Sequence, residues 1–167
     1  LRSHEDVQFF LPRAHTIDRS ELEAFISERN VPVTITEDHT YDLMQICDVC
    51  LAASGTATLE TAMMELPTVL LYKVSPITYG IGKMVVNLTH VGLPNIVAGK
   101  EVIPELLQDD VSADAIVNTV LPLLDDLQVN QHMRSELRGV KEKLGESGAV
   151  NRVAQLIYDL GKEKTNE

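Results

Sequence analysis

The chain has 167 residues, of which 44% are hydrophobic and 23% are charged. This composition is typical of a globular protein with one sizeable core and argues against disorder. The formal net charge of −11 makes nucleic acid an unexpected partner, because no basic stripe is available to neutralise phosphates, but it does not exclude contact with a membrane.

The first part of the chain alternates expected strands and helices with short connections. The expected strands are Val7–Leu11, Val33–Thr36, Val49–Ala53 and Thr68–Tyr72, and the expected helices are Ser20–Arg29, Thr40–Ile46 and Gly55–Leu66. The strand segments are short and mostly apolar or β-branched, whereas the helical segments carry apolar stripes three and four residues apart. This alternation predicts an α/β fold with a parallel sheet wound by right-handed crossovers.

The second part is expected to be mainly helical. Ser75–Leu88 begins with a cap followed by proline and is apolar nearly all round, so it is expected either to be buried or to meet a lipid or another chain. Residues 92–100 are expected to form a loop, and Pro104–Gln108 a short helix. Three helices are expected to close the chain, at about 112–124 with a kink at Pro122, at about 130–144, and after Gly148.

The junction Ser54–Glu60 follows an apolar strand and opens a helix. Ser54 is a plausible N-cap, and Gly55 lets a ligand approach the backbone. The free N–H groups and the dipole of the helix favour an anion such as a phosphate over residues 54–57. Glu60 lies four residues after Thr56 on the same face, and its two oxygens suit a pair of neighbouring hydroxyls, as on a ribose. These features indicate a nucleotide site, with an ordinary strand-to-helix turn as the alternative.

Cys47 and Cys50 form a C-x-x-C pattern. A redox or zinc role would need a helix that begins at the first cysteine, or a second pair of ligands. The sequence offers neither, and its histidines are scattered. Two reduced, partly buried thiols are therefore expected, which fits the cytosol.

An ordered set of motifs, colinear from about Cys47 to Asp109, resembles the lipid-A-disaccharide synthase family. The motifs are Ala53-Ser54-Gly55-Thr56-Ala57 with Leu59-Glu60, then Tyr72-Lys73 and Pro76, Leu93-Pro94-Asn95, Ala98-Gly99-Lys100, and Pro104-Glu105-Leu106-Leu107-Gln108. The resemblance implies the carboxyl-terminal half of a GT-B glycosyltransferase, a Rossmann-like parallel sheet with helices on both faces followed by C-terminal helices. Residues 1–125 are then the expected UDP-sugar-binding domain, and residues 126–167 a C-terminal helical segment.

The resemblance also implies an activity for the complete enzyme, a bacterial, membrane-associated hexosyltransferase of lipid A and lipopolysaccharide biosynthesis. It would transfer 2,3-diacylglucosamine from UDP to 2,3-diacylglucosamine 1-phosphate, giving lipid A disaccharide 1-phosphate and UDP, without a metal or cofactor. The expected location is the cytoplasmic face of the inner membrane, with peripheral contact through Ser75–Leu88 and a homodimer left open. The alternatives are another GT-B UDP-sugar enzyme of the epimerase type, a non-catalytic nucleotide-sugar-binding module, or a segment that dimerises through its apolar helix.

The family pattern places the UDP diphosphate over Ser54, Gly55, Thr56 and Ala57, with the ribose at Glu60. Asn95 matches an asparagine regarded as essential in the family, and it is assigned to the sugar or diphosphate because an amide cannot act as a base near neutral pH. Replacing Asn95 by alanine is therefore expected to lower turnover far more than stability. The pattern assigns three more side chains to the donor, with surface charge and helix capping as the alternative: Lys73, Glu105 and Gln108.

Two parts of the family pattern are not found in this sequence. One is a strand and helix with a Gly-Ser-Arg loop, and the other is the amino-terminal domain, which carries the catalytic acidic residue and most of the acceptor site. With a charged start at Leu1 and no initiator methionine, the chain is expected to be a fragment that is inactive alone. In a doubly wound sheet the first strand is central, so its loss predicts two exposed strand edges.

Overall fold

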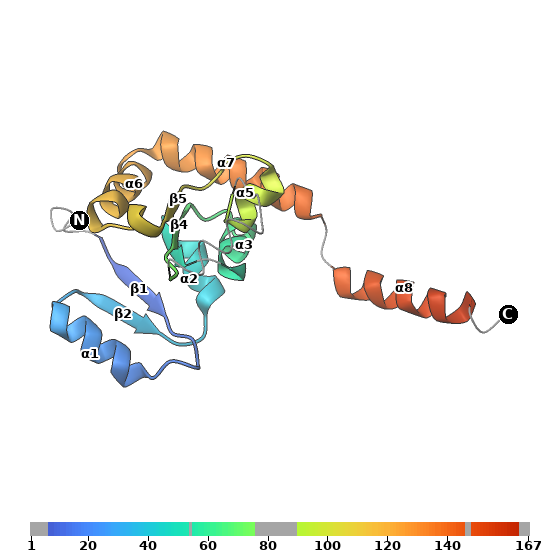
Figure 1. Ribbon diagram of the computed structural model, residues 1–167, viewed down its shortest axis with the longest axis horizontal. Coiled ribbons are helices and arrows are strands. Elements are labelled where there is room, and N and C mark those ends of the chain that lie inside the picture. Colours follow the sequence, from blue (N-terminus) through green and yellow to red (C-terminus); the bar gives the residue numbers. More distant parts are fainter. Residues whose placement is uncertain (1–6, 54, 76–89, 146–147, 164–167) are drawn as a thin grey trace.

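The computed structural model describes residues 7–53, 55–75, 90–145 and 148–163. Its strands are β1 (Phe9–Pro12), β2 (Val33–Thr36), β3 (Cys50–Ala53), β4 (Thr68–Tyr72) and β5 (Glu105–Leu107). Its helices are α1 (Arg19–Arg29), α2 (Thr40–Ile46), α3 (Thr56–Met63), α5 (Leu93–Ala98), α6 (Ala113–Asp125), α7 (Leu127–Leu144) and α8 (Ala149–Glu163), with a 3₁₀ turn at Gln108–Asp110. The alternation of strand and helix (Figure 1) confirms the predicted α/β class.

The parallel strands form two separate sheets. Strands β1 and β2 pair in parallel, and β3, β4 and β5 form a second parallel sheet with β4 in the middle. A doubly wound sheet has the strand order 3-2-1-4-5-6. In that numbering β1 and β2 correspond to strands 2 and 3, and β3, β4 and β5 correspond to strands 4, 5 and 6. The break between the two sheets therefore falls where strand 1 of that order would lie. The two unpaired edges that were predicted are confirmed, at β1 and at β3.

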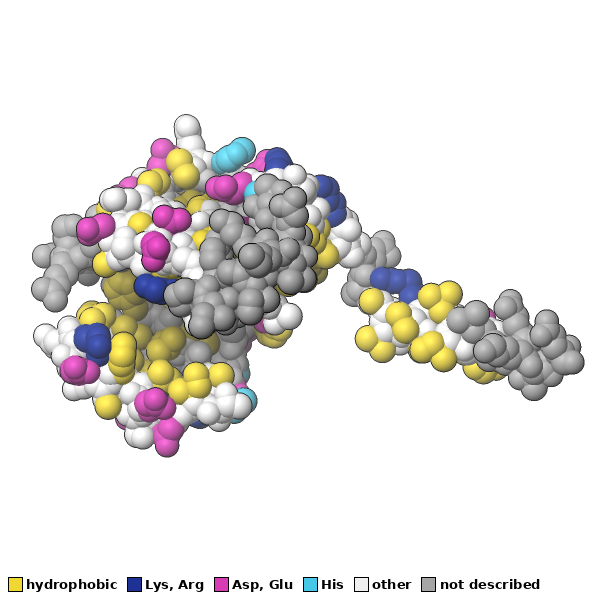
Figure 2. Space-filling view, in the orientation of Figure 1, with side chains coloured by type: hydrophobic (Ala, Val, Ile, Leu, Met, Phe, Trp, Pro, Cys, Tyr) yellow, Lys and Arg dark blue, Asp and Glu magenta, His cyan; other side chains and the backbone are white. Residues whose placement is uncertain are grey.

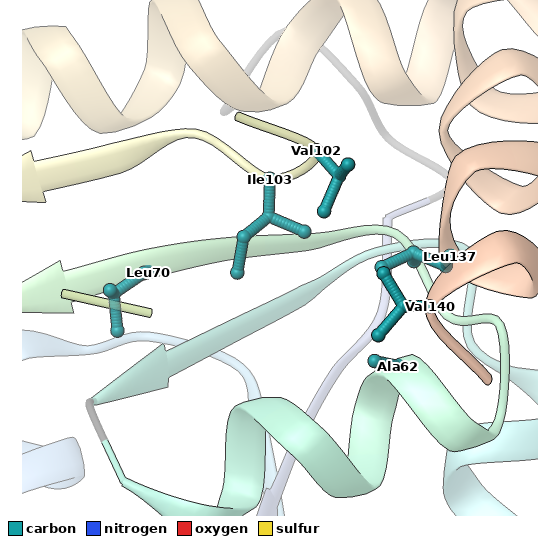
Figure 3. Packing of buried hydrophobic residues seen from close by; sticks show 6 residues of the cluster. All are labelled: Ala62, Leu70, Val102, Ile103, Leu137 and Val140. Carbon is teal, nitrogen blue, oxygen red and sulfur yellow. The ribbon is translucent and has the colours of Figure 1, made fainter. Parts of the chain in front are cut away.

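The core is built around the sheet of β3, β4 and β5. Val69 and Leu70 are neighbours on β4, so their side chains point to opposite faces of the sheet. Leu70 packs in a cluster with α3 and α7, which Figure 3 shows, and Val69 packs with residues of α6. Helices therefore cover both faces of this sheet, as predicted. The buried members of the first cluster are Ala62, Leu70, Val102, Ile103, Leu137 and Val140, and those of the second are Val69, Val120 and Leu123.

The unit of β1, α1 and β2 contributes no buried residue to this core. Every residue from 7 to 51 is at least partly exposed, and Phe25 of α1 is 59% exposed. Figure 1 shows the unit beside the main body, and Figure 2 shows a hollow with hydrophobic side chains between them. The unit is therefore held mainly by its own strand pairing and by polar contacts such as Arg13 Nε to Glu37 at 2.9 Å.

Several local predictions are wrong. The N-cap of α3 is Gly55 rather than Ser54, which lies outside the described residues, and the helix spans Thr56–Met63 rather than 55–66. The expected loop at 92–100 contains α5, which Gly99 ends in the left-handed conformation. The expected helix at 104–108 is instead β5 and the start of the 3₁₀ turn, because Leu106 pairs with Leu71 on the free edge of β4. The predicted helix Ser75–Leu88 lies outside the described residues except for Ser75.

The closing helices differ in how they pack. Helix α6 continues through Pro122, and α7 begins at Leu127, three residues earlier than expected, capped by the Asp126 carboxylate. Helix α7 packs against α3, α5 and α6, whereas α8 projects from the body (Figure 1) with its apolar residues exposed. The predicted domain boundary at 125–126 falls between α6 and α7, and it stays a prediction. No helix in the described part of the chain is long and apolar enough to cross a membrane.

Candidate functional site

The carboxyl ends of β3, β4 and β5 lie at one edge of the sheet. Ala53 is opposite Leu71, and Tyr72 is opposite Leu107, so the three strands end within about two residues of one another. The chain continues from these ends through residues 54–57, through Lys73 and through Gln108. In open α/β sheets ligands bind outside the carboxyl ends of the strands. Three of the predicted site positions therefore gather at the edge where a ligand is expected.

Gly55 turns the chain from β3 into α3. Its φ of 93° and ψ of −157° fall in a region that is essentially restricted to glycine. The turn is fixed by Thr58, whose hydroxyl donates to the Gly55 carbonyl at 2.8 Å. A Cβ on Gly55 would meet no described atom within 4 Å, so the need for glycine comes from the backbone conformation rather than from crowding. Within the described part of the chain, no atom fills the space beside this turn.

The start of α3 presents the features of an anion site. Thr56 and Ala57 are exposed, and the first N–H groups of a helix have no acceptor within the helix. The helix dipole adds a partial positive charge at the same place. Glu60 is half-buried one turn further along, and Lys73 is exposed just after β4. An anion at the helix start would therefore have a lysine just after the neighbouring strand β4 and Glu60 one turn along α3.

Asn95 is fully buried on α5 rather than exposed at this edge. Its Oδ1 accepts from the backbone N–H of Val102 at 2.7 Å and of Ile103 at 2.9 Å. Its Nδ2 donates to the Ile103 carbonyl at 2.8 Å and to Glu105 Oε1 at 2.7 Å. These four bonds use the full hydrogen-bonding capacity of an amide. A direct contact with a sugar or diphosphate, as predicted from the resemblance, would require some of them to break.

Glu105 of β5 holds the beginning of α5. Its Oε2 accepts from the Val91 N–H and its Oε1 from the Gly92 N–H, both at 2.9 Å. A Cβ on Gly92 would lie 3.1 Å from Glu105 Oε1 and 3.2 Å from a Leu70 methyl, so glycine there permits the close approach of the carboxylate. Together with the bond from Asn95, these contacts tie α5 to β5. The Asn95–Glu105 pair is therefore part of a hydrogen-bonded framework that supports the carboxyl edge of the sheet.

Gln108 is attached to the backbone that follows β4. The Val74 N–H donates to Gln108 Oε1 at 2.8 Å, and Gln108 Nε2 donates to the Val74 carbonyl at 3.1 Å. The contacts that the resemblance assigned to the donor for Glu105 and Gln108 are instead made within the protein in this structure. Sequence reasoning missed this framework, because its partners are backbone groups that only the β4–β5 pairing brings close.

The two cysteines are free and partly buried, as predicted. Burial, with Cys47 as a lesser cause, raises the pKa of the Cys50 thiol to about 11. Burial and the neighbouring Asp48 also raise the pKa of Cys47. Both thiols are therefore poor nucleophiles at neutral pH. Among the described residues, no group of three or more His, Cys, Asp or Glu side chains is arranged to hold a metal ion.

Two shallow hollows occur in the described structure away from this edge. One lies between α1 and β2, and the other follows β2 and reaches α2. Both belong to the region of residues 7–51, in which no residue is buried. We attribute them to incomplete packing, and the carboxyl edge of β3 to β5 remains the better candidate site.

The fold and this edge define a Rossmann-like α/β domain, a class in which ligands bind outside the carboxyl ends of the strands. The sequence profile of the family described as lipid-A-disaccharide synthetase matches residues 1–157. The chain belongs to the lipid-A-disaccharide synthase family, which confirms the resemblance seen in the sequence motifs.

Individual relatives agree with this assignment. A lipid-A-disaccharide synthase of Geobacter sulfurreducens is 44% identical over 161 residues, which cover 96% of this chain and 42% of the relative. Those of Syntrophotalea carbinolica and Nitrosococcus oceani are 36% and 38% identical, covering 96% and 90% of this chain and 41% and 39% of the relatives. The chain thus spans about two fifths of the length of these curated relatives.

Proposed function

We propose that this chain is the donor-binding part of a glycosyltransferase that makes the lipid A disaccharide. The complete protein transfers 2,3-diacylglucosamine from UDP to 2,3-diacylglucosamine 1-phosphate and releases UDP. The catalytic acid or base and the acceptor site lie on other parts of the protein, so this chain alone is inactive. The relatives' shared name supports this reaction over the epimerase type and over a non-catalytic binding module.

The observation that carries the proposal is the start of α3 at the carboxyl edge of the sheet. The diphosphate lies over Gly55, Thr56 and Ala57, where free N–H groups and the helix dipole favour negative charge. Lys73, just after the neighbouring strand β4, offsets the charge of the leaving group. Glu60 accepts hydrogen bonds from the ribose hydroxyls. Asn95 acts from within the framework, through its pair with Glu105, rather than by touching the donor.

The acylated substrates bring the protein to the cytoplasmic face of the inner membrane. The segment 75–88, apolar in sequence, supplies a peripheral contact with acyl chains or lipid. The proposal includes no metal or cofactor, because Lys73 and the start of α3 would offset the charge of the departing diphosphate. A homodimer is compatible with this arrangement, and its test is the mass of the full-length protein in solution.

The test of the nucleotide site is calorimetric titration of UDP into the full-length protein. Glu60→Ala should weaken UDP binding about tenfold, the effect of losing one well-placed charged hydrogen-bonding partner. The matched control is Glu101→Ala, which removes an exposed carboxylate just before β5, at the opposite end of that strand from the site.

The control should bind UDP with wild-type affinity. If Glu60→Ala bound UDP as tightly as the wild type, the ribose assignment would be wrong. If the full-length wild type did not bind UDP at all, the proposed function itself would be refuted.

A further inference from the structure

Gln108 makes an unusual contact at the end of the β4–β5 pairing. The last backbone pair in the register is Tyr72 with Leu107, and beyond it the backbone of Gln108 turns away into a 3₁₀ turn. The side-chain amide of Gln108 then takes the place of a peptide group. It accepts from the Val74 N–H at 2.8 Å and donates to the Val74 carbonyl at 3.1 Å. The ladder between the strands is thus extended by a side chain.

The backbone of Gln108 is itself in a strained conformation. Its φ is 51°, in the left-handed region that residues other than glycine, asparagine and aspartate seldom adopt. Such conformations persist where surrounding contacts determine them, and they cluster at functional sites. Here the left-handed turn is accompanied by two hydrogen bonds that place the glutamine amide against Val74.

Lys73 lies between Tyr72, which pairs with β5, and Val74, which is bonded to Gln108. The backbone of Lys73 is therefore fixed on both sides, while its side chain is exposed at the edge where α3 begins. A lysine has a long and flexible side chain, so fixing its backbone limits the positions that the ammonium group can reach.

We propose that Gln108 is a positioning residue that holds Lys73 at the nucleotide diphosphate without touching the nucleotide. This inference rests on the proposed function, because it takes the anion at the start of α3 to be the diphosphate of the donor. The chemical class of the ligand is a nucleoside diphosphate. Gln108 acts on it through the backbone of residues 73 and 74.

The test is a double-mutant cycle between Gln108 and Lys73 in the full-length protein, read out as UDP affinity by calorimetry. Lys73→Ala should weaken UDP binding about tenfold, as expected for one cation against a phosphate group. Gln108→Ala should weaken it about threefold to fivefold. The double variant should bind UDP about as well as Lys73→Ala alone, because Gln108 has nothing left to position.

Two further variants separate positioning from a general loss of stability. Gln108→Asn keeps the amide and suits the left-handed backbone, but it is one methylene too short to reach Val74. It should therefore lower UDP affinity as Gln108→Ala does while the urea midpoint stays near that of the wild type. Gln131→Ala removes an exposed glutamine of α7 and should change neither quantity.

The outcomes are distinguishable. Non-additive losses with an unchanged urea midpoint for Gln108→Asn support positioning. Additive losses would mean that Gln108 acts independently of Lys73 and would overturn the proposal, as would wild-type UDP affinity in Gln108→Ala or in Lys73→Ala. In each of these cases UDP still binds the wild-type protein, so the proposed function stands, whereas wild-type protein that does not bind UDP would refute that function.

Discussion

Asn95 offers the sharpest test of the framework beneath the candidate site. Asn95→Ala would leave the Val102 and Ile103 N–H groups and the Ile103 carbonyl without a partner in a fully buried place, and it would also remove a donor from Glu105. Each unsatisfied buried polar group costs about 1–3 kcal/mol. Even with relaxation around the new cavity, we expect a loss of at least about 3 kcal/mol, a large fraction of the roughly 5–15 kcal/mol that stabilises a domain.

The assay is urea unfolding followed by circular dichroism. With a denaturant slope of about 1–3 kcal/mol per molar urea, a loss of this size moves the midpoint by about 1 M or more. The matched control is Asn118→Ala, because Asn118 is exposed on α6. Alanine is the better helix former, so this control should be neutral or slightly stabilising.

Equal midpoints for Asn95→Ala and the wild type would refute the assigned hydrogen bonds. The result also decides between two explanations of a loss of turnover. If Asn95 contacted the donor, alanine would lower turnover with little change in stability, as the sequence motif alone led us to expect. The buried network predicts the reverse order, in which the loss of stability comes first and the loss of turnover follows from it.

Three further predictions concern other parts of the fold. The Arg138 guanidinium, with Lys141, holds the pKa of Glu65 below its ordinary 4.5. These ion pairs stabilise the fold by up to about 1 kcal/mol above pH 4.5, and the stabilisation is lost as the pH falls through the lowered pKa. Urea unfolding measured against pH should show this contribution in the wild type and not in Glu65→Gln. Burial raises the pKa of Cys50 to about 11, so iodoacetamide should alkylate it at pH 8 more slowly than a free thiol with a pKa of about 8.5. Mass spectrometry of peptides measures this rate, and a rate faster than that of the free thiol would contradict the burial of Cys50. Amides of β1 and β2 should exchange with deuterium faster than those of β4, because no residue from 7 to 51 is buried; equal protection would mean that this unit packs better than the structure indicates.

The strand-to-helix alternation up to β4 could be predicted from sequence because each element there carries its own periodicity. Strand β5 could not, since Glu105–Leu107 is too short to show a period and becomes a strand by pairing with β4. The same pairing brings Gln108 to Val74. Motifs pointed to Asn95, Glu105 and Gln108 but did not reveal their partners within the protein, because backbone N–H and carbonyl groups leave no trace in the identity of the residues that carry them.

The place of the break between the two sheets bears on how much of the proposed nucleotide site this chain contains. In the doubly wound order, the connection reverses between the first and fourth strands, and the ligand crevice opens at this switch point. Strand β3 takes the fourth place, so in the proposed site α3 and Lys73 would form one wall of the crevice, and the turn after the first strand would form the other. The wall on β3 to β5 has its own packed core of α3, α6 and α7 and should form without the other. We therefore expect this chain alone to bind UDP more weakly than the full-length protein, with the loss confined to contacts of the diphosphate on the side of the break.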